Sequence, residues 1–408
     1  MARITCQAAL GFGCAAGAPA HAALWSIAPS MIWSVDDDSN RYLSDGLRAS
    51  QSGVYTASAV FERDTETTQL SLTPWAMWQR IDDHQYANSD NRSLSGAFGW
   101  NGERQQLQLQ AEIADFSTLE SELTETGILA NDVRRRQTQE AFSWNWALTE
   151  RRTLLVQLSW MDVSYYGTDA TLLNLLSGYK YPTAVLGEQF QLSPNTTLTA
   201  SLFDDELIAG GGELVIPLAG TGLELAEHLP ANVSREAGLK FELVHHFTER
   251  TQVDAYVGES GRTLRGVQSR GTLGGITGTL WMPRGHVDLN VSDTLVPYGT
   301  GVLVQRALAT LSDTFNITET LDAQLALTRI QNNQSTVNLG LDRPYYDNAT
   351  AALDWQWDQP WKLRLESGLT HTETFPLAPS YQTFPITAWR VALSLTWTPQ
   401  ASRGSFSY

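Results

Sequence analysis

The chain has 408 residues, a formal net charge of −17 and a sequence pI near 4.8. This acidic balance argues against nucleic acid as a partner and against a polybasic membrane-surface role. No run of about 18 apolar residues is present, so transmembrane helices are not expected. No linker or composition break divides the sequence into separate domains.

The first 22 residues have the pattern of a secretory signal peptide. Arg3 supplies a positive start, a stretch of small residues follows, and Ala20-His21-Ala22 fits an A-x-A cleavage site. Both cysteines, Cys6 and Cys14, lie in this segment. We therefore expect a cleaved signal peptide over residues 1–22 and a mature chain without disulfides or thiolate metal sites.

Short segments of alternating polarity occupy the rest of the chain. In the clearest one, Gln106 to Ile113, even positions are polar and odd positions are apolar. Successive side chains of a strand point to opposite faces, so each segment has one apolar and one polar face. Eighteen candidate strands start near Leu24, Val54, Gln69, Ser93, Gln105, Thr138, Thr153, Thr183, Thr197, Glu236, Thr251, Gly271, His286, Val302, Thr320, Asp347, Trp361 and Ala388.

The connections between these strands alternate in length. Short turns, such as Thr149-Glu150-Arg151 and Thr248-Glu249-Arg250, alternate with longer stretches. Outer-membrane barrels have short periplasmic turns and longer outside loops. The sequence therefore predicts an all-β fold over residues 23–408. The expected architecture is a transmembrane antiparallel up-and-down β-barrel of about 18 strands, with 16 to 18 compatible with the pattern.

The polarity of each strand predicts which side chains face the lumen. Leu321, Leu325 and Leu327, for example, alternate with Asp322 and Gln324. A lysine or arginine facing lipid at mid-depth costs about 2–4 kcal/mol, so the polar face is expected to point inward. The residues predicted to face the lumen are Gln106, Gln108, Gln110, Glu112, Asp288, Asn290, Asp322, Gln324, Lys362, Arg364, Glu366 and Arg390.

Tryptophans gather near the short turns, where aromatic side chains form a belt at the membrane interface. The predicted belt consists of Trp144, Trp146, Trp281, Trp355, Trp357, Trp361 and Trp397. The alternative is a soluble β-sandwich, but its core tryptophans would not follow the turns.

Two segments depart from the regular pattern. The connection over about residues 204–235 exceeds an ordinary loop in length, which indicates function or disorder. It either folds into the lumen and narrows it, or forms an outside flap with a small hairpin. Near the C-terminus the last clear strand ends at Trp397, Pro399 follows, and Phe406 and Tyr408 come last. The last strand is either later or bulged, or a short tail follows it.

The residues that could take part in catalysis or bind a metal do not indicate an enzyme. G-x-S-x-G and HExxH motifs are missing from the sequence, and no cofactor is expected. Asp36, Asp37 and Asp38 are candidates for a calcium site because Ca²⁺ prefers oxygen ligands, with a solvated acidic loop as the alternative. Arg134-Arg135-Arg136 could contact lipopolysaccharide phosphates from outside. The alternative for these arginines is a surface charge run without a fixed partner.

Several of these segments resemble one known family. The stretch Trp33 to Arg41 resembles the acidic segment after the first strand of large proteobacterial outer-membrane β-barrel proteins of poorly known function. The repeated Thr-Glu-Arg turns, Glu122 to Ile128 and Arg134-Arg135-Arg136 are similar to the same group. The resemblance covers most of the mature chain, implies a barrel and brings no catalytic residues. Some relatives accompany exopolysaccharide export systems, so it also implies a link to such export.

These features together predict a protein of the cell outer membrane, surrounded by outer-membrane lipid and lipopolysaccharide. The leading hypothesis is a channel for polar solutes or polymer, with exopolysaccharide export beside periplasmic export proteins as the specific case. One alternative is a non-conducting structural or anchoring barrel that binds a periplasmic or surface partner. A second alternative is an interfacial lipid hydrolase. The acidic balance disfavours a strongly anionic polymer.

Overall fold

A computed structural model describes residues 23–40, 49–82, 88–118, 133–167, 176–210, 212–218, 223–229, 231–264, 266–299, 301–333, 345–374 and 384–406. The expected signal peptide over 1–22 lies outside these residues, as do the segment from Glu122 to Ile128 and the last residue, Tyr408. Among the described residues, no helix combines the length and apolarity that a membrane crossing requires.

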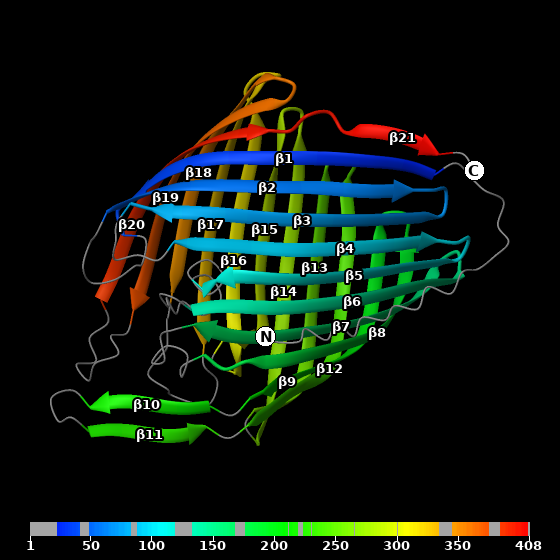
Figure 1. Cartoon of the computed structure of the whole chain (residues 1–408). Helices are drawn as coiled ribbons and strands as arrows, with labels where there is room; N and C mark the ends of the chain where they lie inside the picture. Colours follow the sequence, from blue (N-terminus) through cyan, green and yellow to red (C-terminus); the bar gives the residue numbers. More distant parts are fainter. Residues whose placement is uncertain are drawn as a thin grey trace.

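Eighteen long antiparallel strands close into one barrel (Figure 1). Consecutive strands pair with each other, β9 pairs with β12, and the ring closes where β1 pairs with β20. The strands of the wall are β1 (Ala23–Asp38), β2 (Ser50–Asp64), β3 (Thr68–Ile81), β4 (Ser89–Asn101), β5 (Gln105–Ser117), β6 (Val133–Thr149), β7 (Arg152–Gly167), β8 (Tyr179–Ser193), β9 (Thr196–Ala209), β12 (Asn232–Thr248), β13 (Thr251–Leu264), β14 (Val267–Met282), β15 (Gly285–Tyr298), β16 (Val302–Asn316), β17 (Leu321–Asn333), β18 (Tyr346–Asp358), β19 (Trp361–Thr374) and β20 (Phe384–Trp397). The predicted fold class and strand number are confirmed.

The strands are longer than a bilayer crossing requires. They contain 13 to 17 residues, whereas a tilted spanning strand needs about 9–11. Each strand therefore extends beyond the hydrocarbon layer. Each observed start lies within five residues of its predicted start, because the polar ends of the strands obscure the boundary in sequence.

Two connections at the long-loop end are shorter than the sequence pattern predicts. β13 and β14 meet around Gly266, and β15 and β16 meet around Gly301. Both glycines have positive φ, 80° and 76°, a conformation that glycine adopts without steric penalty. The strands therefore continue into tight turns where the sequence pattern indicates open loops.

The long connection between β9 and β12 contains a small hairpin. Its strands, β10 (Gly212–Leu218) and β11 (Leu223–Leu229), pair only with each other in the described part of the chain. Figure 1 shows this hairpin beyond the ends of β9 and β12, apart from the wall. The arrangement corresponds to the outside flap with a small hairpin.

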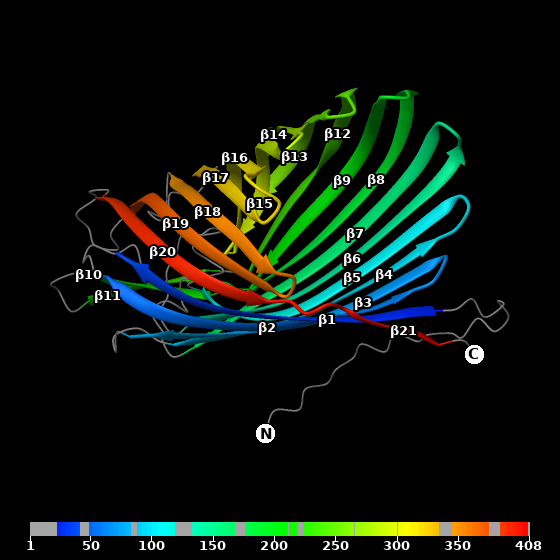
Figure 2. The same ribbon diagram turned by 90° about the horizontal axis from the view of Figure 1, so that it is seen from above.

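The last strand is bulged and continues beyond Trp397. Its continuation, β21 (Ser402–Phe406), pairs with the start of β1, and Figure 2 shows the two side by side. Trp397 lies opposite Met31, and Ser402 lies opposite Ile27. Three residues of β1 therefore face four residues of the last strand, which is a one-residue bulge. The break includes Pro399, which lacks the N–H that a regular ladder requires.

The barrel lumen as the candidate functional site

The tip of the β15–β16 hairpin leaves the barrel wall. β15 pairs with β14 only as far as Asp293, and β16 pairs with β17 only from Gln305 onward. Beyond these points the two strands pair only with each other, from Val296 with Val304 to Tyr298 with Val302. This part of the hairpin is therefore free of the wall's hydrogen-bond ladder and crosses to other strands.

The hairpin tip docks against residues at the start of β8 and β12, several strands away in the wall. The Ser177 amide donates to the Gly299 carbonyl at 2.8 Å, and the Asn232 side-chain amide donates to the Gly301 carbonyl at 3.4 Å. Ser177 precedes β8 and Asn232 begins β12, so neither is next to β15 or β16 in the wall. The tip thus spans part of the lumen near the long-loop end.

An apolar cluster holds the docked tip. Leu295 and Leu303 are 6% and 4% exposed and lie in one cluster with side chains of β7, β8, β9 and β13. The other buried members of the cluster are Val163, Tyr179, Leu207, Ala209 and Leu264. Burial of this apolar surface favours the docked position over one in water.

These contacts identify the inner face of the barrel. Val163 of β7 belongs to the same buried cluster as Leu295 and Leu303 of the tip, so its side of β7 faces inward. Residues that lie opposite each other in neighbouring strands share a face, so the register identifies the inward side of each strand. Val163 lies opposite Gln137 of β6, Gln139 is on the same face of β6, and Gln139 lies opposite Glu112 of β5. In the other direction, Glu236 lies opposite Arg262, and the same face continues through β20 to β1.

The register places every residue predicted to face the lumen on this inner face. On β5 these are Gln106, Gln108, Gln110 and Glu112. On β15 to β20 they are Asp288, Asn290, Asp322, Gln324, Lys362, Arg364, Glu366 and Arg390. The alternate positions, such as Leu289, Leu325 and Leu365, are large apolar side chains that remain exposed, as a lipid-facing surface requires.

Tryptophans form a continuous outward group where the barrel closes. Ring centroids are 6.0 Å apart between Trp355 and Trp357, 6.2 Å between Trp357 and Trp361, and 6.5 Å between Trp361 and Trp397. On β6, Trp144 and Trp146 stack at 5.8 Å. These rings lie toward the short-turn end, at the level of the predicted interface belt.

Trp281 does not share the outward face of these tryptophans. It lies opposite His286, on the same side of β15 as the inward Asp288. Proximity to the turn at Pro283 suggested a belt position, but the parity of β14 places Trp281 on the inner side at the barrel end. Distance from a turn alone therefore does not assign a strand residue to the lipid face.

Charged side chains form a network on the inner wall of β17 to β19. Asp354 is buried, and one of its carboxylate oxygens lies 3.2 Å from both Lys362 Nζ and Arg364 Nη1. Arg364 also lies 2.9 Å from Glu366 and donates to the Gln324 amide oxygen at 2.9 Å. Such a network fixes the positions of the charges along the wall.

A second ion pair lies on the inner wall beside the docked hairpin. Arg262 Nε lies 2.8 Å from Glu236 Oε1, and both side chains are buried. Arg262 also donates to Gln305 at 2.6 Å, and Gln305 donates to Asp293 at 2.6 Å. Asp293 and Gln305 mark the points where the tip leaves the wall, so this chain of contacts ties the base of the tip to β12 and β13.

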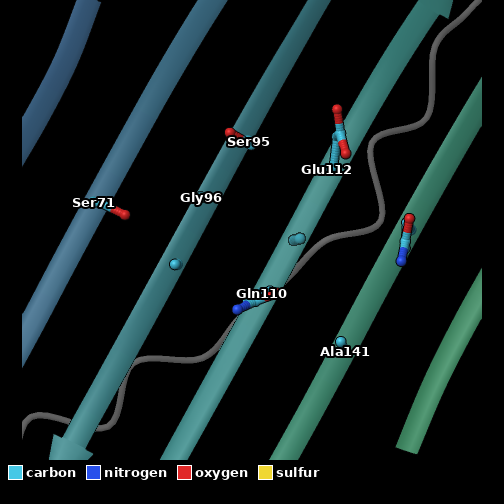
Figure 3. A pocket seen from close by; sticks show the side chains of 9 residues that line it. Ser71, Ser95, Gly96, Gln110, Glu112 and Ala141 are labelled. Carbon is cyan, nitrogen blue, oxygen red and sulfur yellow. The ribbon is translucent and has the colours of Figure 1, made fainter. Parts of the chain in front are cut away.

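The wall of β2 to β6 bears two adjacent hollows on its inner side. One, of about 240 Å³, includes Ser71, Gln110 and Glu112; Figure 3 shows Ser71 on β3 and the other two on β5, with β4 between them. The other, of about 350 Å³, includes Glu62 and Asp64 and shares Ser71 and Gln110 with the first. Three carboxylates line the two hollows together, and neither lining contains a lysine or arginine.

The three aspartates proposed for calcium do not converge. Asp36 points inward, where Ser52 donates to it and Arg390 lies 3.2 Å away. Asp37 is the next residue along the strand and points to the other face. In the described part of the chain, no three His, Cys, Asp or Glu side chains are grouped as a metal site would require.

The inward hairpin is the feature that reasoning from sequence missed. The signal was present from Leu295 to Val304, where apolar residues occupy both alternating positions: Leu295, Val296, Val302, Leu303 and Val304. A wall strand has one polar face, whereas a strand that is apolar on both faces is buried on both. The loss of alternation therefore indicates a segment that leaves the wall and packs inside.

The chain matches no known family by sequence, and no curated protein matches it. Solved structures that resemble it are outer-membrane barrels. The FrpB iron transporter from Neisseria meningitidis (F3-3 variant) aligns with a TM-score of 0.50 and 9% identity, covering 92% of this chain and 81% of that one. The copper transporter OprC aligns at 0.48 and 10%, covering 94% and 82%. Acinetobacter baumannii OccAB3 aligns at 0.46 and 10%, covering 92% and 99%. The chain has the fold of an outer-membrane β-barrel.

Proposed function

We propose that the protein is an outer-membrane channel that passes small neutral and cationic polar solutes through its lumen. The observation that carries the proposal is the inner wall of β2 to β6, whose polar side chains border hollows rather than a packed core. Barrels of 16–18 strands are wide enough to enclose an aqueous channel. Passage past the docked β15–β16 tip sets the size limit.

The charge of this wall supports a preference for cations and neutral solutes. Glu62, Asp64 and Glu112 line the two hollows without a compensating lysine or arginine in the lining. Carboxylates along a confined aqueous path raise the local concentration of cations. The arginines and lysines of β19, in contrast, lie within reach of Asp354 or Glu366.

Reversal potentials in planar bilayers test this proposal. Under a KCl gradient the protein is expected to be cation-selective, and Glu62→Gln/Asp64→Asn/Glu112→Gln is expected to lose most of that selectivity. Glu140→Gln is the control, because Glu140 lies opposite Ala111 on the outer face of the wall. An equal loss of selectivity in the control, or none in the triple variant, would contradict the proposal.

A more specific form of the same hypothesis is that the channel passes a hydroxylated polymer such as exopolysaccharide. The row of Gln106, Gln108 and Gln110 presents amide groups that can exchange hydrogen bonds with sugar hydroxyls. Neutral linear oligosaccharides are then expected to block the ion current, with longer residence for longer chains. An ion current that these oligosaccharides do not block would restrict the proposal to small solutes. A barrel without conductance that captures a periplasmic protein would instead favour the anchoring role.

A further inference from the structure

Three arginines surround one aspartate on the outer face of the barrel. Asp115 of β5 lies 2.6 Å from Arg134, 3.3 Å from Arg136 and 3.7 Å from Arg92. Tyr166 also donates to Asp115 at 2.6 Å. The register explains this convergence, because Asp115 lies directly opposite Arg92 on β4 and Arg136 on β6. Strands β4 to β7 thus contribute to one cluster.

This cluster faces away from the lumen, at the end of the strands where the longer connections lie. Gln137 is inward by the register from Val163, so Arg136 points outward, and Asp115 and Arg92 share that face. The next outward residue of β5 toward the membrane is Ile113, which is apolar and 54% exposed. The cluster therefore begins where the apolar band ends, at the level of the outer-leaflet headgroups.

The cluster has an excess of positive charge. Three guanidinium groups face a single carboxylate, which leaves two positive charges in a chain whose net charge is −17. Asp115 is 7% exposed, whereas the side chains of Arg92 and Arg136 are 73% and 56% exposed. The aspartate is thus a buried anchor, and the two outer arginines present N–H groups to the headgroup layer.

Arg134 and Arg136 are held in place before any ligand binds. Arg134 donates to the backbone carbonyl of Asp90 and to the Tyr166 hydroxyl, and the Arg136 guanidinium lies 5.3 Å from the centre of the Tyr166 ring. Preorganised guanidinium groups bind phosphate through two parallel hydrogen bonds. A carboxylate ligand would offer less charge than a phosphate to the same pair of cations.

We propose that Arg92, Arg134 and Arg136, organised by Asp115, form a binding site for the phosphate groups of an outer-leaflet glycolipid, lipopolysaccharide. Its acyl chains lie along the exposed apolar side chains just below, which include Ile113 and Leu94. This apolar surface next to the arginines is what favours a lipid phosphate over free phosphate. The site lies outside the lumen, so it is independent of the transport proposal.

Titration of the detergent-solubilised barrel with diphosphoryl lipid A tests the proposal, with heat-induced unfolding as the readout. Lipid A is expected to raise the unfolding temperature of the wild type. Arg92→Gln/Arg136→Gln is expected to bind it about tenfold more weakly or worse, because each arginine–phosphate contact is charge-assisted. Arg92→Lys/Arg136→Lys keeps the charge without the planar fork and is expected to fall between the two.

The matched control is Arg104→Gln/Arg151→Gln, which removes the same charge from short turns at the other end of the barrel. It is expected to bind lipid A like the wild type. Equal binding by Arg92→Gln/Arg136→Gln and the wild type would overturn the proposal. Equal stabilisation by dephosphorylated lipid A would also overturn it, as would equal stabilisation by inorganic phosphate at the same concentration. If the glutamine variant does not fold, the lysine variant decides: unchanged lipid A affinity counts against the site.

Discussion

Removal of two leucines from the β15–β16 tip is expected to open the lumen. Leu295→Ala/Leu303→Ala takes away the hairpin's two buried members of the apolar cluster, whereas the strands in the wall keep their pairing. Both side chains are nearly fully buried, and a buried leucine replaced by alanine costs about 2–5 kcal/mol. Even at the lower limit, the pair contributes about 4 kcal/mol to docking.

This loss is large enough to change the population of the docked state. A factor of ten in an equilibrium constant corresponds to about 1.4 kcal/mol, so docking weakens by nearly three orders of magnitude. The predicted result in planar bilayers is a larger single-channel conductance, or frequent transitions to a larger level. The control is Leu289→Ala/Leu311→Ala, a paired couple in the same two strands that faces lipid. Wild-type conductance in the tip variant, with the control also unchanged, would refute the assignment of the tip as the constriction.

Three further substitutions probe the same lumen. Gly301→Ala places a methyl group 2.8 Å from the Ala209 side chain and strains a positive φ, so it is expected to raise the single-channel conductance. Gly266→Ala is equally strained but meets open space, so it is expected to leave the conductance unchanged. Equal changes in conductance for the two variants would contradict the packing contact at Gly301. Arg262→Met leaves the Glu236 carboxylate buried without its partner and is expected to lower the free energy of unfolding in urea by about 3–5 kcal/mol. Glu236→Gln/Arg262→Met removes the buried charge and is expected to recover most of that stability. A double variant as unstable as Arg262→Met would argue against the ion pair. Asp354→Asn leaves Lys362 and Arg364 without their shared carboxylate and is expected to shift the reversal potential in the direction of greater anion permeability. An unchanged reversal potential would place this network away from the ion path.

Strand number and facing could be predicted because one rule governs both. A wall strand with lipid on one side and water on the other must alternate, as Leu325 and Gln324 do. The alternation fixes the facing, and the short turns fix the topology. The bulge near Pro399 could be suspected but not assigned, because its register depends on pairing with β1, at the other end of the sequence.

The interior of the barrel could not be predicted in the same way. Docking of the β15–β16 tip depends on a cluster that joins Leu303 to residues of strands far away in sequence, such as β7 and β9. The ion pair between Asp354 and Arg364 likewise follows from strand register rather than from composition. The outer arginine cluster shows the same limit, since a run of arginines becomes a site only when Asp115 and Arg92 are brought beside it.

Cysteine scanning along β17 tests the central claim, a closed barrel with water inside and lipid outside. The two cysteines of the sequence are Cys6 and Cys14, so each cysteine introduced into a Cys6→Ser/Cys14→Ser variant is the only thiol available for labelling. In lipid vesicles, cysteines at Gln324 and Thr328 are expected to react with a water-soluble, membrane-impermeant thiol reagent, and cysteines at Leu325 and Leu327 are expected to be protected. Equal labelling at all four positions, or the reverse pattern, would contradict the account.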